Sequence, residues 1–221
     1  LAQDWVPSRH GADDRIGAAN YLSADKVLQA AGLITTGKVY SLGIETAEDS
    51  PAYGSRSYEI DIVPGSDSIP VGADAVTSND ERVRTSFGVG SQIDGLGHLG
   101  VGHQYYNGLT TEQIVSDAGL AELGTHTIPP IVTRGVLLDM TAYFNVDMVA
   151  EGTAFNQAEI AAAASAQGIE IQRGDVVLFH TGWMQLLGND DERFISVQPG
   201  PGVEGASYLA ELGVVAVGAD T

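Results

Sequence analysis

The chain has 221 residues, of which 43% are hydrophobic, and this is enough to bury the core of one domain of ordinary size. Acidic residues outnumber basic residues 29 to 10, for a formal net charge of -19, so the chain lacks the basic face that nucleic-acid phosphates or anionic membranes attract. The absence of cysteine excludes disulfides, cysteine nucleophiles and cysteine-ligated zinc fingers. Cysteine usage therefore does not tell whether the protein is cytoplasmic or exported after signal cleavage. We therefore expect a soluble protein with no nucleic-acid or membrane partner.

The first half of the chain is predicted to be rich in strands and loops. A helix is predicted over residues 24–31, with Ser23 as its N-cap and Gly32 as its stop. Residues 39–44 are predicted to form a strand, and the alternation of apolar and acidic residues over 58–62 predicts a second, half-buried strand. Two turn-rich loops are expected, at residues 46–57 and 64–80. The second is long enough to act as a lid or a binding segment.

The second half is predicted to alternate strands with helices. The expected helices span residues 110–118, 156–168 and 203–212. The expected buried strands span residues 134–139, 175–180 and 214–217. Two of the helices begin with a capping-box pattern, Thr110 with Gln113 and Asn156 with Glu159. This order of elements predicts one mixed α/β domain with a partly parallel central sheet.

Three of the expected strands end in side chains that can carry chemistry: Asp139, His180, and Asp220 followed by Thr221. If these strands run parallel in one sheet, their carboxyl ends meet at one edge, where open α/β sheets bind ligands. A strand-end aspartate taken alone more often caps the next helix or turn, and that alternative stays open. Taken together, the three strand ends make this edge a candidate ligand site.

The segment from Phe87 to His98 is rich in glycine and carries the sharpest chemical pattern in the chain. Gln92, Asp94 and His98 have even spacing, so an extended backbone would point all three side chains to one face. A carboxylate and an imidazole on one face can bind a metal, or they can form an acid–base pair in which the aspartate orients the histidine. The alternative is a glycine-rich bend whose aspartate and histidine are satisfied locally.

A polar and aromatic cluster follows this segment, and it suits a small organic ligand. It consists of His103, Tyr105, Tyr106 and Asn107. The two tyrosines could equally be half-buried packing residues. His103, Tyr105, Tyr106 and the strand-end His180 are the candidate substrate-binding residues.

The run Gly88-Val-Gly-Ser-Gln-Ile-Asp-Gly-Leu-Gly-His98 resembles the signature of the metal-dependent cyclase family, which includes bacterial kynurenine formamidase and isatin hydrolase. That signature, His-x-Gly-Thr-His-x-Asp-x-Pro-x-His, aligns with the run without a gap. Gly90, Asp94 and His98 match it, and Ser91 replaces the threonine conservatively. The chain is more similar still to a larger branch of the family that carries a Gln-x-Asp-Gly-Leu-Gly-His signature.

Four further segments resemble the same branch, so the likeness extends over nearly the whole chain. They are residues 14–21, 130–139, 174–183 and 218–221. The resemblance implies an α/β protein with a swivelling β/β/α cyclase-like domain and a mixed central sheet, formed by residues 1–221 as a single domain. Because the sequence stops one residue after Asp220, which ends the run of the last expected strand, we expect that domain to lack a C-terminal segment.

The resemblance also implies an activity: hydrolysis of a carbon–nitrogen or ester bond in a small cyclic amide, imide, formamide or lactone. In family terms, Asp94 is a metal ligand and His98 is the general base near a metal-bound water, with Asp94 and His98 as the catalytic pair. The implied metal is a divalent ion, manganese or zinc. A homo-oligomer is expected from the resemblance alone.

The chain departs from the family at two metal ligands, where Gly88 and Gln92 replace histidines. Glycine has no side chain to coordinate, and the neutral oxygen of Gln92 is a weaker ligand that suits hard cations better than zinc. The remaining family ligands, a histidine and a glutamate, would lie beyond Thr221. Asp94 and Gln92 are the metal ligands we expect here, and two alternatives stay open: a metal-independent hydrolase of the same fold, and a non-catalytic small-molecule-binding protein.

Overall fold

The computed structural model describes residues 6–64 and 70–221, and the chain divides into two compact units. The first unit comprises Leu1–Lys38, Ile93–Leu186 and Val197–Thr221, and the second comprises Val39–Gln92 and Leu187–Ser196. The first unit holds a parallel sheet with its helices, and the second holds an antiparallel hairpin. The expectation of a single domain over residues 1–221 stays a prediction.

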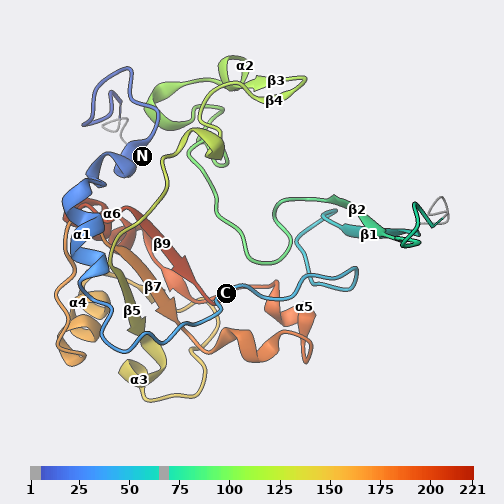
Figure 1. The fold of residues 1–221 in the computed structure, drawn as a ribbon. Helices are drawn as coiled ribbons and strands as arrows, with labels where there is room; N and C mark the ends of the chain where they lie inside the picture. The colour runs from blue at the N-terminus through green and yellow to red at the C-terminus, as the bar shows by residue number, and fades with distance from the viewer. Residues whose placement is uncertain (1–5, 65–69) are drawn as a thin grey trace. The chain divides into compact units, whose positions relative to one another are not determined.

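A three-stranded parallel sheet forms the centre of the first unit (Figure 1). Its strands are β5 (Gly135–Asp139), β7 (Val176–His180) and β9 (Ala216–Ala219), in the order β5-β7-β9. Asp139 lies opposite His180, and Phe179 lies opposite Ala219, so the carboxyl ends of all three strands meet at one edge. The predicted parallel sheet is confirmed, with the last strand beginning two residues later than expected.

The core of this unit lies on one face of the sheet. Because side chains alternate along a strand, Val136 and Leu138 of β5 are buried while Leu137 between them is exposed. Helices α4 (Gln157–Ala166) and α6 (Val203–Leu212) pack against this core, and Ile160 and Leu209 are their buried contributions. The apolar strands predicted from the sequence therefore bury one face only.

The helices of the first unit begin and end where capping chemistry places them. Helix α1 (Ala24–Ala31) begins at Ser23, whose hydroxyl accepts a hydrogen bond from the Lys26 amide, and it ends at Gly32 as predicted. The predicted capping box at Asn156 is present in α4, and α6 ends at Gly213, which adopts a φ of 80°.

The helix that was expected over residues 110–118 is shorter than predicted. Its capping box is formed, but α2 (Thr111–Ile114) ends after one turn. Val115–Ser116 instead form strand β3, which pairs with β4 (Gly119–Leu120) in a tight hairpin. A β-branched valine and a glycine at φ 118° favour that hairpin over further helix, which is why the predicted end was wrong.

Shorter elements complete the first unit. They are the 3-10 helices η1 (Gly17–Tyr21), η2 (Tyr106–Gly108), η3 (Thr125–Thr127) and η4 (Trp183–Leu186), helix α3 (Met140–Phe144), and the parallel pair β6 (Ala154–Phe155) and β8 (Gly200–Pro201). Each helix among the described residues is too short or too polar to span a bilayer.

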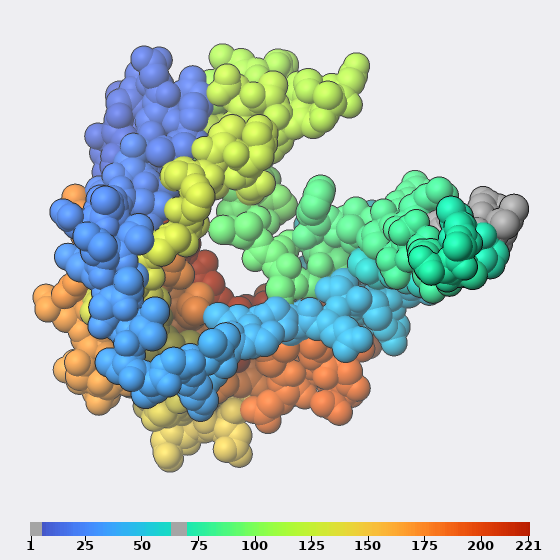
Figure 2. Space-filling view, viewed as in Figure 1, coloured from blue at the N-terminus to red at the C-terminus, as the bar shows by residue number. Residues whose placement is uncertain are grey.

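The second unit contains the hairpin of β1 (Tyr58–Pro64) and β2 (Asn79–Thr85), drawn in blue-green and green in Figure 2, together with the short helix α5 (Asp191–Phe194). The strand predicted over 58–62 is therefore present, but Ile60 and Ile62 are exposed rather than half-buried. The hairpin is a two-stranded ribbon, and the described residues of this unit add no second layer over its apolar face.

The strand predicted over residues 39–44 is absent. Val39 and Leu42 are 89% and 76% exposed, and the Ile44 amide donates to the Ser91 hydroxyl instead of to a neighbouring strand. A strand needs a partner for its backbone groups, and an apolar sequence does not supply one. The turn-rich loop over 46–57 is confirmed. In the second predicted loop, residues 70–78 lie between the strands, whereas residues 65–69 lie outside the described part of the chain.

Candidate active site

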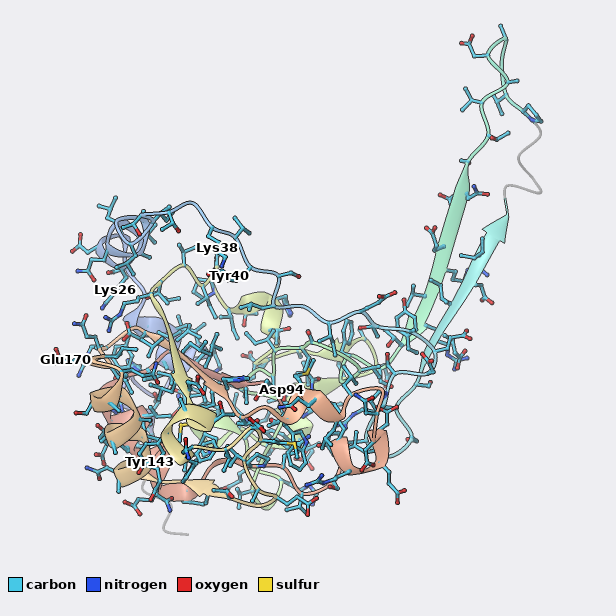
Figure 3. All side chains as sticks on the ribbon, turned by 90° about the horizontal axis from the view of Figure 1, so that it is seen from below. Lys26, Lys38, Tyr40, Asp94, Tyr143 and Glu170 are labelled. Carbon is cyan, nitrogen blue, oxygen red and sulfur yellow. The ribbon has the colours of Figure 1, made fainter. Side chains whose placement is uncertain are left out.

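The Asp94–His98 pair lies in a turn of the first unit (Asp94 is labelled in Figure 3). The His98 amide donates to the Gly95 carbonyl at 3.0 Å, and the turn places His98 Nε2 3.8 Å from Asp94 Oδ2. Both side chains are about half exposed, at 43% and 52%. A turn rather than the alternation of an extended backbone brings the imidazole to the carboxylate, so the backbone here is the glycine-rich bend that the sequence left open.

Two glycines allow this turn to pack closely against the following segment. A Cβ added at Gly95 would lie 2.8 Å from a methyl carbon of Thr125, and one added at Gly97 would lie 2.9 Å from a methyl carbon of Leu120. The turn is therefore held by close packing that only glycine permits at these positions. This packing limits the movement of the backbone that carries Asp94 and His98.

Gly88 and Gln92, which the resemblance aligns with two ligand histidines, lie in the second unit. Gln92 ends a segment of that unit, and a Cβ added at Gly88 would lie 2.9 Å from Arg56 Nε and 3.2 Å from Gln92 Oε1. A histidine in place of Gly88 would thus meet a guanidinium group. The expected pairing of Gln92 with Asp94 as metal ligands stays a prediction.

The donor set of the described residues does not fit a tight transition-metal site. Residues 6–64 and 70–221 contain no group of three or more His, Cys, Asp or Glu side chains placed to hold a metal ion. Catalytic zinc sites use three protein ligands and leave a fourth position for water. The chain's own acid and base groups are therefore the candidate catalytic groups.

The edge of the parallel sheet brings together the three predicted strand-end residues. His180 Nδ1 lies 3.0 Å from Asp220 Oδ2, and Asp220 Oδ1 accepts hydrogen bonds from the amide and hydroxyl of Thr181 at 2.8 and 2.6 Å. The Gly182 amide also donates to Asp220 Oδ2, at 3.0 Å. Thr181 is a member of this edge that sequence reasoning missed, although its place directly after the buried strand was a usable signal.

Asp139 takes the capping role that the sequence left open for it. Its Oδ1 accepts hydrogen bonds from the Thr141 hydroxyl at 2.6 Å and from the Ala142 amide at 2.9 Å, and it is the N-cap of α3. These bonds hold the pKa of the Asp139 carboxyl below its ordinary value despite some burial, and the nearby His180 lowers this pKa further.

The cluster of His103, Tyr105, Tyr106 and Asn107 is largely committed to structure. The Tyr106 hydroxyl bonds to the Ser8 hydroxyl and donates to Asp14 Oδ2 at 2.7 Å, and burial together with the Asp14 charge raises the pKa of Tyr106 to about 12. Asn107, at a φ of 58°, accepts from the Ser8 amide and donates to backbone carbonyls of residues 11, 12 and 14. This network fastens the N-terminal segment to the unit.

The other two members of that cluster occupy a turn beside it. Tyr105 donates its amide to the Leu109 carbonyl at 2.7 Å, and its ring stands 3.1 Å from the position of a Cβ at Gly100. His103 is exposed at a φ of 63°, where the chain reverses between Val101 and Gln104. Substrate binding by His103, Tyr105 and Tyr106 stays a prediction, and the bonded hydroxyl of Tyr106 favours packing for that residue.

Comparison with known proteins agrees with this fold. The family described as "Putative cyclase" matches residues 40–221. The chain belongs to this cyclase family. The chain is similar to a solved structure of a novel cyclase, with a TM-score of 0.88 and 26% identity over 97% of this chain and 75% of that chain. The mixed α/β fold expected from the sequence is thus the cyclase fold.

Two isatin hydrolases share the cyclase fold at lower identity. One, bound to the product analogue thioisatinate, superposes with a TM-score of 0.57 and 17% identity over 90% of this chain and 73% of that chain. The other, isatin hydrolase A from Labrenzia aggregata bound to benzyl benzoate, gives 0.58 and 15% over 88% and 73%. A comparison of this chain with curated proteins found no match.

Proposed function

We propose that the chain is a hydrolase that opens a carbon–nitrogen or ester bond in a small cyclic amide, imide, formamide or lactone. Membership of the cyclase family supports this proposal, as does the fold shared with two isatin hydrolases, whose substrate isatin is a cyclic amide. The observation that carries it is the exposed pair of Asp94 and His98, 3.8 Å apart on a turn held rigid by Gly95 and Gly97.

In the proposed reaction, His98 is the general base. Asp94 lies beside Nε2, so Nδ1 of the imidazole is the nitrogen that takes a proton from water as the water oxygen attacks the substrate carbonyl. The Asp94 carboxylate stabilises the imidazolium that forms. His98 then returns the proton to the leaving nitrogen or oxygen as its bond to the carbonyl carbon breaks. A ring-opened product carries a carboxylate together with an amine, an amide or an alcohol. Backbone amides of the glycine-rich turn are the proposed donors to the oxyanion.

Whether a divalent metal ion takes part in the reaction is decided by experiment. The family resemblance implies manganese or zinc, but Gly88 and Gln92 stand where two ligand histidines are expected and the described donors form no three-ligand group. Elemental mass spectrometry on protein purified without chelator measures bound metal directly. Loss of turnover on chelation with recovery on adding one cation would establish the metal-assisted route, and unchanged turnover would establish the metal-independent one.

The first prediction tests the base. Replacing His98 with alanine should lower kcat/KM on any turned-over lactam, imide, formamide or lactone by about 10²- to 10⁴-fold, the usual contribution of a general base. The thermal unfolding midpoint should stay unchanged, because the side chain is 43% exposed. His126→Ala is the matched control, since His126 stands on η3 outside the pair and should leave turnover intact. Full activity in His98→Ala would reject the mechanism, and tight binding without turnover in the wild type would identify a binding protein.

A further inference from the structure

His180 and Asp220 form a second imidazole–carboxylate pair, at the carboxyl edge of the parallel sheet and separate in sequence from the Asp94–His98 turn. Their 3.0 Å contact is a hydrogen bond, whereas the Asp94–His98 distance of 3.8 Å is not. Both residues stand at the ends of paired strands, so the backbone that carries them is fixed by the sheet register.

The carboxylate of Asp220 is held rigidly. It accepts hydrogen bonds from the Thr181 amide, the Thr181 hydroxyl and the Gly182 amide. The Thr181 hydroxyl in turn accepts from the Trp183 amide at 3.2 Å. An ionised carboxylate can only accept, so the hydrogen on the bond to His180 must belong to the imidazole Nδ1.

A neutral imidazole carries one proton. With the hydrogen on Nδ1, the Nε2 atom of His180 carries a lone pair and is a hydrogen-bond acceptor. No described residue makes a hydrogen bond to Nε2, and the side chain is 45% exposed, whereas Asp220 is 18% exposed. Two carboxylates lie near this imidazole: Asp220 contacts it directly, and Asp139 lies on the neighbouring strand. Oδ1 of Asp139 already accepts the hydrogen bonds that cap α3.

We infer that His180 and Asp220 form a ligand-binding dyad, in which Asp220 fixes the imidazole tautomer and Nε2 of His180 accepts a hydrogen bond from an N–H group of a small cyclic amide or imide. The inference rests on the proposed function only for the class of ligand. Within that class, the dyad should favour lactams and imides, because they carry the N–H that pairs with Nε2. Lactones and N-alkylated rings lack this N–H. Asp220 is the positioning residue, and His180 touches the ligand.

The tautomer is measured on the wild-type protein. Long-range ¹H–¹⁵N correlation spectra of the five histidines, at a pH where the imidazoles are neutral, should show His180 protonated at Nδ1. Its signals are assigned as those missing from a His180→Gln sample. A spectrum with the proton of His180 on Nε2 would overturn the inference.

Ligand preference is measured with succinimide and N-methylsuccinimide, which share a ring and differ at the N–H. Wild-type protein should bind succinimide about tenfold more tightly, the value of one hydrogen bond. His180→Leu removes the acceptor and should bring the ratio to about one, while His180→Gln keeps an acceptor oxygen near the Nε2 position and should retain the preference. A steric effect of the methyl group would persist in His180→Leu, so a preference that survives there would overturn the inference, as would equal binding or no binding of both probes by the wild type.

The two proposals fail separately. Turnover that depends on His98, together with a negative result for His180, would leave the hydrolase standing without the dyad. Succinimide preference and the Nδ1 tautomer in a protein that turns over nothing would leave the dyad standing as a binding site.

Discussion

Arg134 donates to both carboxylate oxygens of the fully buried Asp175, at 3.1 and 2.6 Å, and the Gln172 amide donates to the same carboxylate at 2.7 Å. A buried carboxylate survives in a protein interior only when its acceptor positions are filled in this way. The pair joins the start of β5 to the start of β7, at the opposite end of the sheet from the His180 edge. Its role is therefore structural.

The second prediction concerns this pair. Asp175→Ala should lower the free energy of unfolding by about 3–5 kcal/mol, because it leaves the Arg134 charge partly buried without its partner. Denaturant titration measures the change. Glu122→Ala is the matched control: Glu122 forms an exposed ion pair with Arg15 at 3.1 Å, and such pairs contribute about 0–1 kcal/mol. Equal effects of the two substitutions would contradict the structural role.

At the scale of a single element, the first turn of α3 depends on one carboxylate. The third prediction is that Asp139→Ala costs about 1 kcal/mol of unfolding free energy near neutral pH, the usual value of an N-cap. The pKa of Asp139 is lowered in the folded state, so its contribution is present above the unfolded pKa and is lost as pH falls through the folded one. The difference between wild type and Asp139→Ala should shrink below about pH 4. Asp139→Asn, which also caps, should cost less and show a weaker pH dependence; a pH-independent difference would contradict the argument.

The packing of α6 supplies the fourth prediction. A Cβ at Gly205 would overlap the Phe155 carbonyl oxygen and lie 3.0 Å from an Ile160 methyl carbon. Gly205→Ala should therefore destabilise the protein by about 1–3 kcal/mol, even though alanine favours helix more than glycine does. Gly135→Ala is the control, because a Cβ there meets nothing within 4 Å. Thermal unfolding of the two variants separates overpacking from a general effect of losing a glycine.

At the scale of the whole molecule, the excess of 29 acidic over 10 basic residues is the dominant electrostatic feature. Like charges confined in a folded chain repel, and salt shortens the range of that repulsion from about 10 Å at 0.1 M to about 3 Å at 1 M. The fifth prediction is that the thermal unfolding midpoint rises with sodium chloride over this range. Differential scanning calorimetry checks it, with sucrose of equal osmolality as the uncharged control. A midpoint that falls with salt would show that attractive ion pairs outweigh the repulsion.

Much of this fold follows from local sequence. Helix α1 has the bounds its caps predict, the capping box of α4 is formed, and the apolar runs before Asp139 and His180 are strands. These signals are local, since a cap satisfies its own helix end and alternation needs only the strand itself. The parallel arrangement was predictable because short strands separated by helices have few other ways to bury a common apolar face.

The features that local sequence did not predict depend on partners far away in the chain. Residues 39–44 have a strand-like sequence, yet within residues 6–64 and 70–221 no strand pairs with them. The sequence left Tyr106 open between ligand binding and packing, and its hydroxyl bonds to Ser8 and Asp14, more than 90 residues earlier in the chain. In both cases the deciding contact is made between distant segments, and no local pattern encodes it.

By itself, the sequence determined the acidic character, the capped helices, the parallel strands and the residues that can carry chemistry. Only the tertiary structure decided how those residues meet: Asp94 approaches His98 through a turn rather than a strand face, and Asp220 bonds His180 across two strands of one sheet. The physical reason is that residue type sets what a side chain can do, whereas hydrogen-bond distance and burial are set by where the backbone carries it. Asp139 and Asp220 show this most plainly, because two strand-end aspartates of one sheet became a helix cap and the partner of a histidine.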